Sequence, residues 1–290
     1  MNQKNFCKLC LELKNLRDSH LLPKSLYRIV CTGERNTNPV IMTPEAALQT
    51  SKQVRDYLLC DDCELRFNRG GEKYVLDNCF RGEGKFRLRK TLEAHEPKFK
   101  IDAGFVYDVS AIQGVDASKI LYFAASIFWR ASVHRWRTGM RTLDSVSLGD
   151  KYEEQFRQYL MGEEEFPCRA TVWTAISRSV NPDNVAFVPT KGRQEGYFCH
   201  RFSIPGIVFF MYVGKMVPQL FLNMGLPKGG LVYVVDHADS IVRRDSMEVL
   251  KTAKPLGRLL KTGNSSREKS DPNDGPSPLL QTKPKRIAIS

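Results

Sequence analysis

Two Cys-X-X-Cys pairs, Cys7 with Cys10 and Cys60 with Cys63, constrain the fold of this chain more than any other feature of its sequence. Two intervening residues allow both thiolates of a pair to face one ion, and two pairs supply the four soft ligands of a closed tetrahedral zinc site. A redox motif of this type occurs singly and near a βαβ pattern, which the sequence lacks. The pairs therefore predict a structural zinc ion.

Residues 1–95 carry both pairs, are rich in charged and turn-forming residues, and contain only short apolar runs. Such a segment buries little core, so it depends on a bound metal for stability. Leu58 and Leu59 precede the second pair and predict a strand that leads into a helix, whose N-terminal dipole favours thiolates. A knuckle, a hairpin and a helix carrying the second pair make a treble clef. The other cysteines lack a partner at this spacing and are expected to be buried thiols: Cys31, Cys79, Cys168 and Cys199.

Residues 96–261 are expected to form a second domain of mixed helices and strands, so that the whole chain is α+β. Residues 96–165 are predicted to be mainly helical: Asp116 is a suitable N-cap for a long helix that is apolar on nearly all sides, and a second helix is predicted for Lys151–Met161. Residues 166–235 change to short runs rich in β-branched and aromatic residues, separated by turn signals, which predicts an antiparallel sheet. One more helix is predicted within residues 236–255.

The charge of the chain points to a polyanionic partner. A net charge of +12 and an isoelectric point near 9.3 are typical of proteins that bind nucleic acid or an anionic surface. No apolar stretch reaches the roughly 20 residues of a spanning helix, so no membrane is expected. The chain lacks a secretion signal and is expected to be cytoplasmic, where cysteines serve as thiols or metal ligands. Residues 262–290 are polar and rich in Pro and Gly, which predicts a disordered tail.

A histidine and a helix face between and after the pairs carry the possible chemistry. His20 follows the first pair by ten residues, at the end of an expected strand, and Pro23 opens an expected short helix. Glu64 and Asn68 stand at positions i and i+4, on one face of the helix after the second pair. Glu72 shares that face if the helix continues through the two preceding glycines, which often end a helix. Taken alone, such a polar face is typical of solvated helices.

The segments Cys7–Cys10, Ser19–Lys24 and Leu58–Glu64 resemble the HNH endonuclease family in its zinc-containing ββα-metal form, over roughly residues 5–75. The resemblance implies a treble clef in which His20 is the general base that activates water. It also implies that the helix holds a catalytic Mg²⁺ or Mn²⁺ ion through Glu64 and Asn68, with Glu72 as a further ligand. Glu64 stands where the family usually has a histidine, and a carboxylate suits these hard cations.

The resemblance predicts a metal-dependent endonuclease that hydrolyses phosphodiester bonds, with DNA the expected substrate and bacterial defence against foreign DNA the expected setting. Lys24, Arg66 and Arg69 are the expected nucleic-acid contacts. Two further basic segments could grip phosphates. One is Arg81–Lys90, expected as an edge strand; the other is the end of the long helix, with Arg130, Arg135, Arg137 and Arg141.

The alternative function is a non-catalytic zinc treble clef that binds nucleic acid or a partner protein. In either case the second domain would bind substrate, a partner protein or a second copy of the chain. The discriminating feature is the set of His20, Glu64 and Asn68, which a nuclease must bring to one cation beside an open basic surface.

Overall fold

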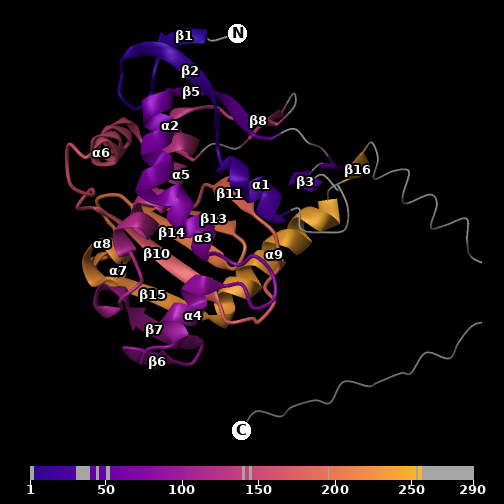
Figure 1. Cartoon of the computed structure of the whole chain (residues 1–290), viewed down its shortest axis with the longest axis vertical. Helices are drawn as coiled ribbons and strands as arrows, with labels where there is room; N and C mark the ends of the chain where they lie inside the picture. Colours follow the sequence, from indigo (N-terminus) through magenta and orange to yellow (C-terminus); the bar gives the residue numbers. More distant parts are fainter. Residues whose placement is uncertain are drawn as a thin grey trace, which may run out of the picture.

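The computed structural model describes residues 3–30, 40–43, 46–49, 53–138, 141–143, 146–194, 196–252 and 254–256. The predicted tail, residues 262–290, lies outside these ranges, as does Cys31. The structure is α+β, as predicted, with a four-cysteine cluster near the N-terminus and a large sheet flanked by helices (Figure 1).

The N-terminal part consists of a small antiparallel sheet and a helical run. Strands β1 (Gln3–Phe6), β2 (Leu13–His20) and β5 (Arg55–Cys60) pair in the order β1-β2-β5. Helix α1 (Lys24–Val30) begins directly after Pro23, as the sequence predicts. The strand β5 leads straight into α2 (Asp61–Phe67), with Cys60 at the N-cap, which confirms the predicted strand-to-helix transition.

The predicted helix face continues past the glycine pair. After α2 the chain forms a π-helical turn, η1 (Asn68–Glu72), and then α3 (Lys73–Asn78), without leaving helical geometry. A Cβ atom on Gly71 would lie 2.5 Å from the Lys119 carbonyl oxygen and 2.7 Å from the Phe123 amide nitrogen. The glycines therefore serve close packing of η1 on the long helix α5 (Ala117–Val133), and they do not end the helix.

Substituting Gly71 by alanine should destabilise the protein. Alanine gains about 1 kcal/mol over glycine in helix propensity, whereas overpacking against rigid backbone atoms costs about 3 kcal/mol. We expect the free energy of unfolding to fall by about 2 kcal/mol in urea denaturation. Arg69→Ala is the matched control, because Arg69 is exposed on the same turn. A Gly71→Ala protein as stable as wild type would contradict this account of the helix crossing.

Within the described ranges, the central sheet has eight strands in the order β11-β13-β14-β10-β15-β7-β6, with β12 paired to β13. Five of the short runs within residues 166–235, which the sequence predicts as strands, become β10 (Ala170–Ser177), β11 (Phe187–Thr190), β13 (Tyr197–Ile204), β14 (Ile207–Val213) and β15 (Leu231–Val235). The added strands are β6 (Phe99–Ile101), β7 (Gly104–Asp108) and β12 (Arg193–Gln194).

The sheet differs from the prediction in two ways. Strand β10 pairs in parallel with β15, so the sheet is mixed and not purely antiparallel. Between β14 and β15 the chain passes through α7 (Gln219–Met224) and α8 (Leu226–Gly229), and a parallel neighbour requires such a crossover. Strands β6 and β7 come from a segment that the sequence predicts as mainly helical, and β7 pairs with β15.

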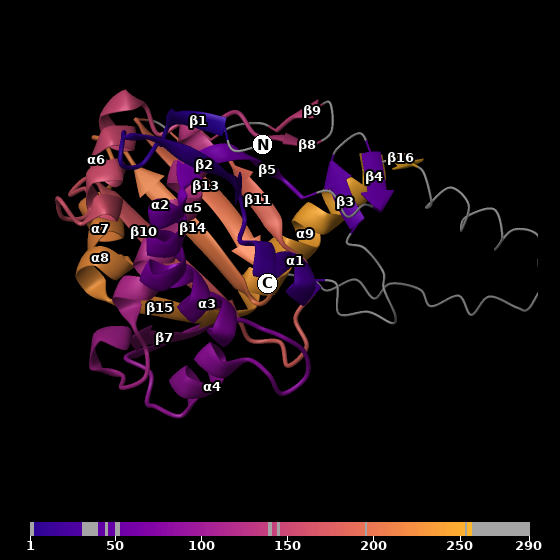
Figure 2. The same ribbon diagram turned by 45° about the horizontal axis from the view of Figure 1, so that its top comes forward.

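Helices cover both faces of this sheet (Figures 1 and 2). On one face, Val232 and Val234 of β15 join a core cluster that contains α5. On the other face, Tyr233 and Val235 join a second cluster that contains α9 (Asp236–Thr252), the helix predicted within residues 236–255. This alternation explains why β15 is apolar throughout.

Helix α5 lies between the central sheet and the N-terminal part. Asp116 caps it by accepting a hydrogen bond from the Lys119 amide at 3.0 Å, as predicted. Every residue from Phe123 to Ala131 is buried. One hydrophobic cluster runs from Cys7 and Phe67 through α5 to the sheet, so the zinc-ligand segment shares its core with the larger part of the chain.

The remaining elements are shorter or peripheral. Helix α6 (Asp150–Met161) nearly matches the predicted Lys151–Met161, and Gly162, which caps its C-terminus, adopts the left-handed conformation. Residues Arg87–Glu93 form helix α4, so the prediction of an edge strand there is wrong. The other elements are η2 (Val109–Ala111), β3 (Val40–Thr43), β4 (Ala46–Gln49), β8 (Arg137–Thr138), β9 (Arg141–Thr142) and β16 (Lys254–Leu256).

Candidate metal centre and adjoining pocket

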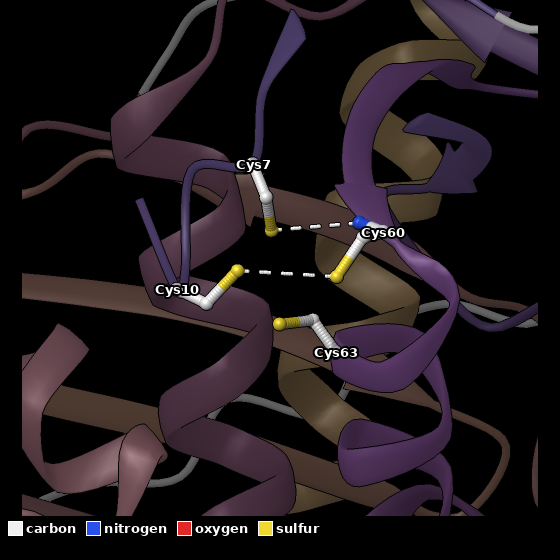
Figure 3. A group of neighbouring side chains, drawn as sticks. All are labelled: Cys7, Cys10, Cys60 and Cys63. Carbon is white, nitrogen blue, oxygen red and sulfur yellow. Dashed lines mark hydrogen bonds between the residues drawn. The ribbon is translucent and has the colours of Figure 1, made fainter. Parts of the chain in front are cut away.

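The four cysteines of the two pairs meet at one point, as predicted (Figure 3). Their Sγ atoms all lie within 4.8 Å of one another, and Cys10 Sγ is 3.9 Å from Cys60 Sγ. A tetrahedral zinc ion with bonds of about 2.3 Å places its sulfur ligands about 3.8 Å apart. The donor set and its spacing therefore fit a structural zinc ion.

Backbone contacts shape the first knuckle. The Leu11 amide donates to the Cys7 carbonyl oxygen at 2.9 Å, and Leu11 adopts a positive φ of 61° that closes the turn. The Cys60 amide donates to Cys7 Sγ at 3.4 Å. From α6, Arg157 Nη1 donates to the Leu9 carbonyl oxygen at 3.1 Å, which joins the knuckle to the body of the protein.

Close packing of the four sulfur atoms shifts the pKa values of three of the thiols. A hydrogen bond from Cys63 lowers the pKa of Cys7 to about 4, and the same contact raises the pKa of Cys63. Burial raises the pKa of Cys10. Four thiolates this close would repel one another, so full ionisation requires a cation between them. The cluster is thus electrostatically suited to a divalent soft metal.

The cysteines outside the cluster differ in exposure. Cys79 is buried, and burial raises its pKa to about 12. Cys199 is half-buried, and Cys168 is exposed. The prediction of a buried thiol is therefore wrong for Cys168, which lies in the exposed loop between α6 and β10.

A pocket of about 610 Å³ adjoins the metal centre and contains the predicted catalytic set. His20 enters from the end of β2, and Glu64, Asn68 and Glu72 line the same pocket from α2 and η1. The segments are far apart in sequence and meet because β2 pairs with β5, which leads into α2. Glu64, Asn68 and Glu72 therefore face one pocket from the same side of the helical run.

Two polar atoms in this pocket have no hydrogen-bond partner within the described part of the chain. They are Nε2 of His20 and Oε1 of Glu64, and both are shielded from solvent. Buried polar atoms in proteins are normally paired, so each unpaired one calls for an explanation. A cation or a substrate group in the pocket would satisfy both.

The environment of His20 favours the neutral imidazole. Burial lowers its pKa, while a hydrogen bond with Gln53 and the charges of Asp18 and Glu64 oppose that shift. A neutral ring near pH 7 can accept a proton from water or bind a metal.

Glu72 has a different partner from the one predicted. Its Oε1 accepts a hydrogen bond of 2.6 Å from Nη2 of Arg130, which belongs to α5. Burial raises the pKa of Glu72, and the guanidinium offsets part of the effect. Arg130 is 1% exposed, so it is not part of an open basic surface at the end of the long helix.

The predicted nucleic-acid contacts separate in space. Lys24 lines the pocket and is exposed. Arg66 donates to the Met161 carbonyl oxygen at 3.0 Å, and Arg69 is exposed; the pocket lining includes neither. Arg28, one turn after Lys24, lines the pocket and was missed, although its i+4 spacing on the short helix was visible in the sequence.

The residue before His20 has a structural role. Ser19 is buried, and its Oγ accepts a hydrogen bond from the Leu59 amide at 3.1 Å. It therefore secures β2 to β5, close to an irregularity in the strand pairing between Leu16 and Asp18.

The two candidate sites differ in compactness. Among the described residues, the four cysteines are the one group of three or more His, Cys, Asp or Glu side chains whose ligand atoms converge within 4.8 Å.

None of the described helices combines the length and apolar character that crossing a bilayer requires.

No family model, curated protein or solved structure matches the chain, so its function must be inferred from the chemistry of these sites.

Proposed function

We propose that this protein is a metal-dependent nuclease that hydrolyses phosphodiester bonds, with DNA as the expected substrate. The proposal rests on two buried atoms, His20 Nε2 and Glu64 Oε1, which have no hydrogen-bond partner among the described residues and lie in one pocket beside the cysteine cluster. Imidazole and carboxylate side chains are the groups that water activation and cation binding require.

The residues of the pocket can be given roles. His20, kept neutral by burial, accepts a proton from the attacking water. Glu64 and Asn68 would hold a Mg²⁺ or Mn²⁺ ion, for which oxygen ligands are suited. Such a cation supplies charge neutralisation at the scissile phosphate and at the leaving oxygen. Glu72 is hydrogen-bonded to Arg130, so we assign ion binding to the carboxylate of Glu64.

The rim of the pocket suits a polyanion. Lys24 and Arg28 project from one face of α1 and line the pocket. Arg17 also lines it and is paired with Asp61. With the net charge of +12, these cations favour contact with the phosphates that flank the scissile bond.

A second candidate function is a non-catalytic zinc module that binds nucleic acid or a partner protein. One observation favours it: the ligand atoms of His20, Glu64 and Glu72 share a pocket but do not converge as tightly as the four cysteine sulfurs. The defence role against foreign DNA belongs to the nuclease proposal alone.

The discriminating experiment is cleavage of plasmid, single-stranded DNA and RNA by the purified full chain, with and without added Mg²⁺ or Mn²⁺. Cutting should require the added ion. In Glu64→Gln, which keeps the shape and removes the charge, the rate should fall by at least about 100-fold. Glu83→Gln, an exposed glutamate outside the pocket, should cut like wild type. Absence of cutting on every substrate would support the binding module, whereas equal cutting by Glu64→Gln would exclude Glu64 as a ligand of the catalytic ion.

A further inference from the structure

We propose that Arg130 is a positioning residue, which fixes the end of β2 and the turn η1 on α5 and so holds His20 and Glu64 toward a common point. The inference rests on the proposed function, because the groups that it positions are those assigned there to water activation and cation binding. Arg130 lines the wall of the pocket but belongs to a helix 50 residues or more beyond the zinc ligands.

The side chain of Arg130 bonds to two other segments and to its own helix. Nη1 donates to the carbonyl oxygen of His20 at 2.8 Å, at the last residue of β2. Nη2 donates to Glu72 Oε1 at 2.6 Å, at the end of η1. Nε donates to the Ser126 carbonyl oxygen at 3.3 Å, within α5 itself. One planar group therefore sets the spacing between the base-bearing strand, the ligand-bearing helix and the core.

The surroundings of the guanidinium leave it little freedom. Arg130 is 1% exposed and Glu72 is 7% exposed. The guanidinium carbon lies 5.1 Å from the centre of the Phe67 ring, and Phe67 is the last residue of α2. Trp136 Nε1 donates to the Arg130 carbonyl oxygen at 2.8 Å, which holds the backbone at the end of α5.

The stability of the fold alone does not require an ion pair here. Desolvating two charges is expensive, and well-packed apolar residues at such positions are often equally stable. The fork of arginine can serve several acceptors at fixed angles, whereas the lysine ammonium is a point charge. The acceptor that distinguishes this site is the His20 carbonyl, because it couples the guanidinium directly to the base.

The test separates positioning from stability with two variants of the full chain. Arg130→Met/Glu72→Met removes the tether and leaves no buried unpaired charge. Arg130→Lys retains a charge for Glu72 but loses the fork that also holds His20. The control is Arg201→Met, which removes an ion pair of 2.7 Å to Asp245 between β13 and α9. The measurements are zinc content, melting temperature, Mn²⁺ affinity by calorimetry, cleavage kinetics, and the imidazole NMR signals of His20.

We expect the two variants to retain zinc and to fold. Their Mn²⁺ affinity and kcat should fall by about 10–100-fold, the range found when residues that orient metal ligands are removed. KM for DNA should change little, and the His20 signals should shift. Arg201→Met should match wild type in zinc content, Mn²⁺ affinity, kcat and His20 signals.

Wild-type Mn²⁺ affinity, kcat and His20 signals in a folded Arg130→Met/Glu72→Met protein would overturn the proposal. If that variant does not fold, Arg130→Lys with unchanged His20 signals would overturn it. A wild-type protein that binds no Mn²⁺ and cuts no substrate would refute the nuclease function. In that case the His20 signals alone decide whether Arg130 positions the ring.

Discussion

Replacing Cys60 by serine should release the zinc ion and unfold the N-terminal part of the chain. Cys60 is 2% exposed and stands where β5 becomes α2, so its sulfur links the small sheet to the helix. Structural zinc sites contribute about 10–16 kcal/mol of apparent binding free energy, which is comparable with the whole stability of a typical domain. The remaining three cysteines cannot close a four-ligand site.

The consequence should extend beyond the cluster itself. The residues around the cysteines share one hydrophobic core with α5, so loosening α2 removes one wall of that helix. We expect loss of zinc in elemental analysis, a lower melting temperature, and loss of protection from hydrogen exchange in β5 and α2. A strong chelator should have the same effect on wild type. Cys168→Ser is the matched control, because Cys168 is exposed and lies outside the cluster. A Cys60→Ser protein with wild-type zinc content would refute the assignment of this ligand.

The features predicted correctly from the sequence are those determined within a few residues. Pro23 directly precedes α1, Asp116 caps α5, and Gly162 directly follows α6. The CxxC spacing is also local: each pair needs only one turn of backbone to direct both sulfurs to the same side. In these cases the residue type and the backbone conformation determine each other directly.

The features that the sequence does not show depend on distant partners. Strand β7 pairs with β15, which lies more than 120 residues later, and its three β-prone residues, Phe105, Val106 and Tyr107, are too short a run to indicate that partner. Arg130 has the same local sequence context whether its side chain is in solvent or buried, and its acceptor Glu72 is 58 residues away. The glycine pair before Glu72 has a similar ambiguity, because the contact that explains it belongs to α5.

The candidate pocket is determined partly by local sequence and partly by contacts between distant segments. Its members Glu64 and Asn68 follow from helical periodicity, and His20 was identified from its position at the end of a strand. Their meeting in one pocket depends on the pairing of β2 with β5, which periodicity does not determine. The rim residue Arg28 becomes meaningful only once α1 is placed beside that pocket.

Substituting His20 by alanine should lower the cleavage rate sharply while leaving the fold and the zinc ion intact. A positioned general base contributes about 10²–10⁴-fold to a rate, so the variant should lose an amount within that range. Nε2 of His20 makes no hydrogen bond to the described residues, so its removal leaves no partner unsatisfied at that atom. His95→Ala is the matched control, since His95 is exposed and bonds to the Thr91 carbonyl oxygen within its own helical turn.

The pH dependence provides a second test of the same residue. Burial lowers the pKa of His20, and only the neutral ring can accept a proton. The wild-type rate should therefore stay constant as pH falls to about 6.5, the ordinary value for histidine, and should decrease only below it. A cation bound at Glu64 would move this decrease in the same direction. If the His20→Ala protein cuts as fast as wild type, or retains the same acid limb, the base lies elsewhere. If neither protein cuts any substrate, the cysteine-bound metal centre is better explained as a scaffold for binding nucleic acid or a partner protein.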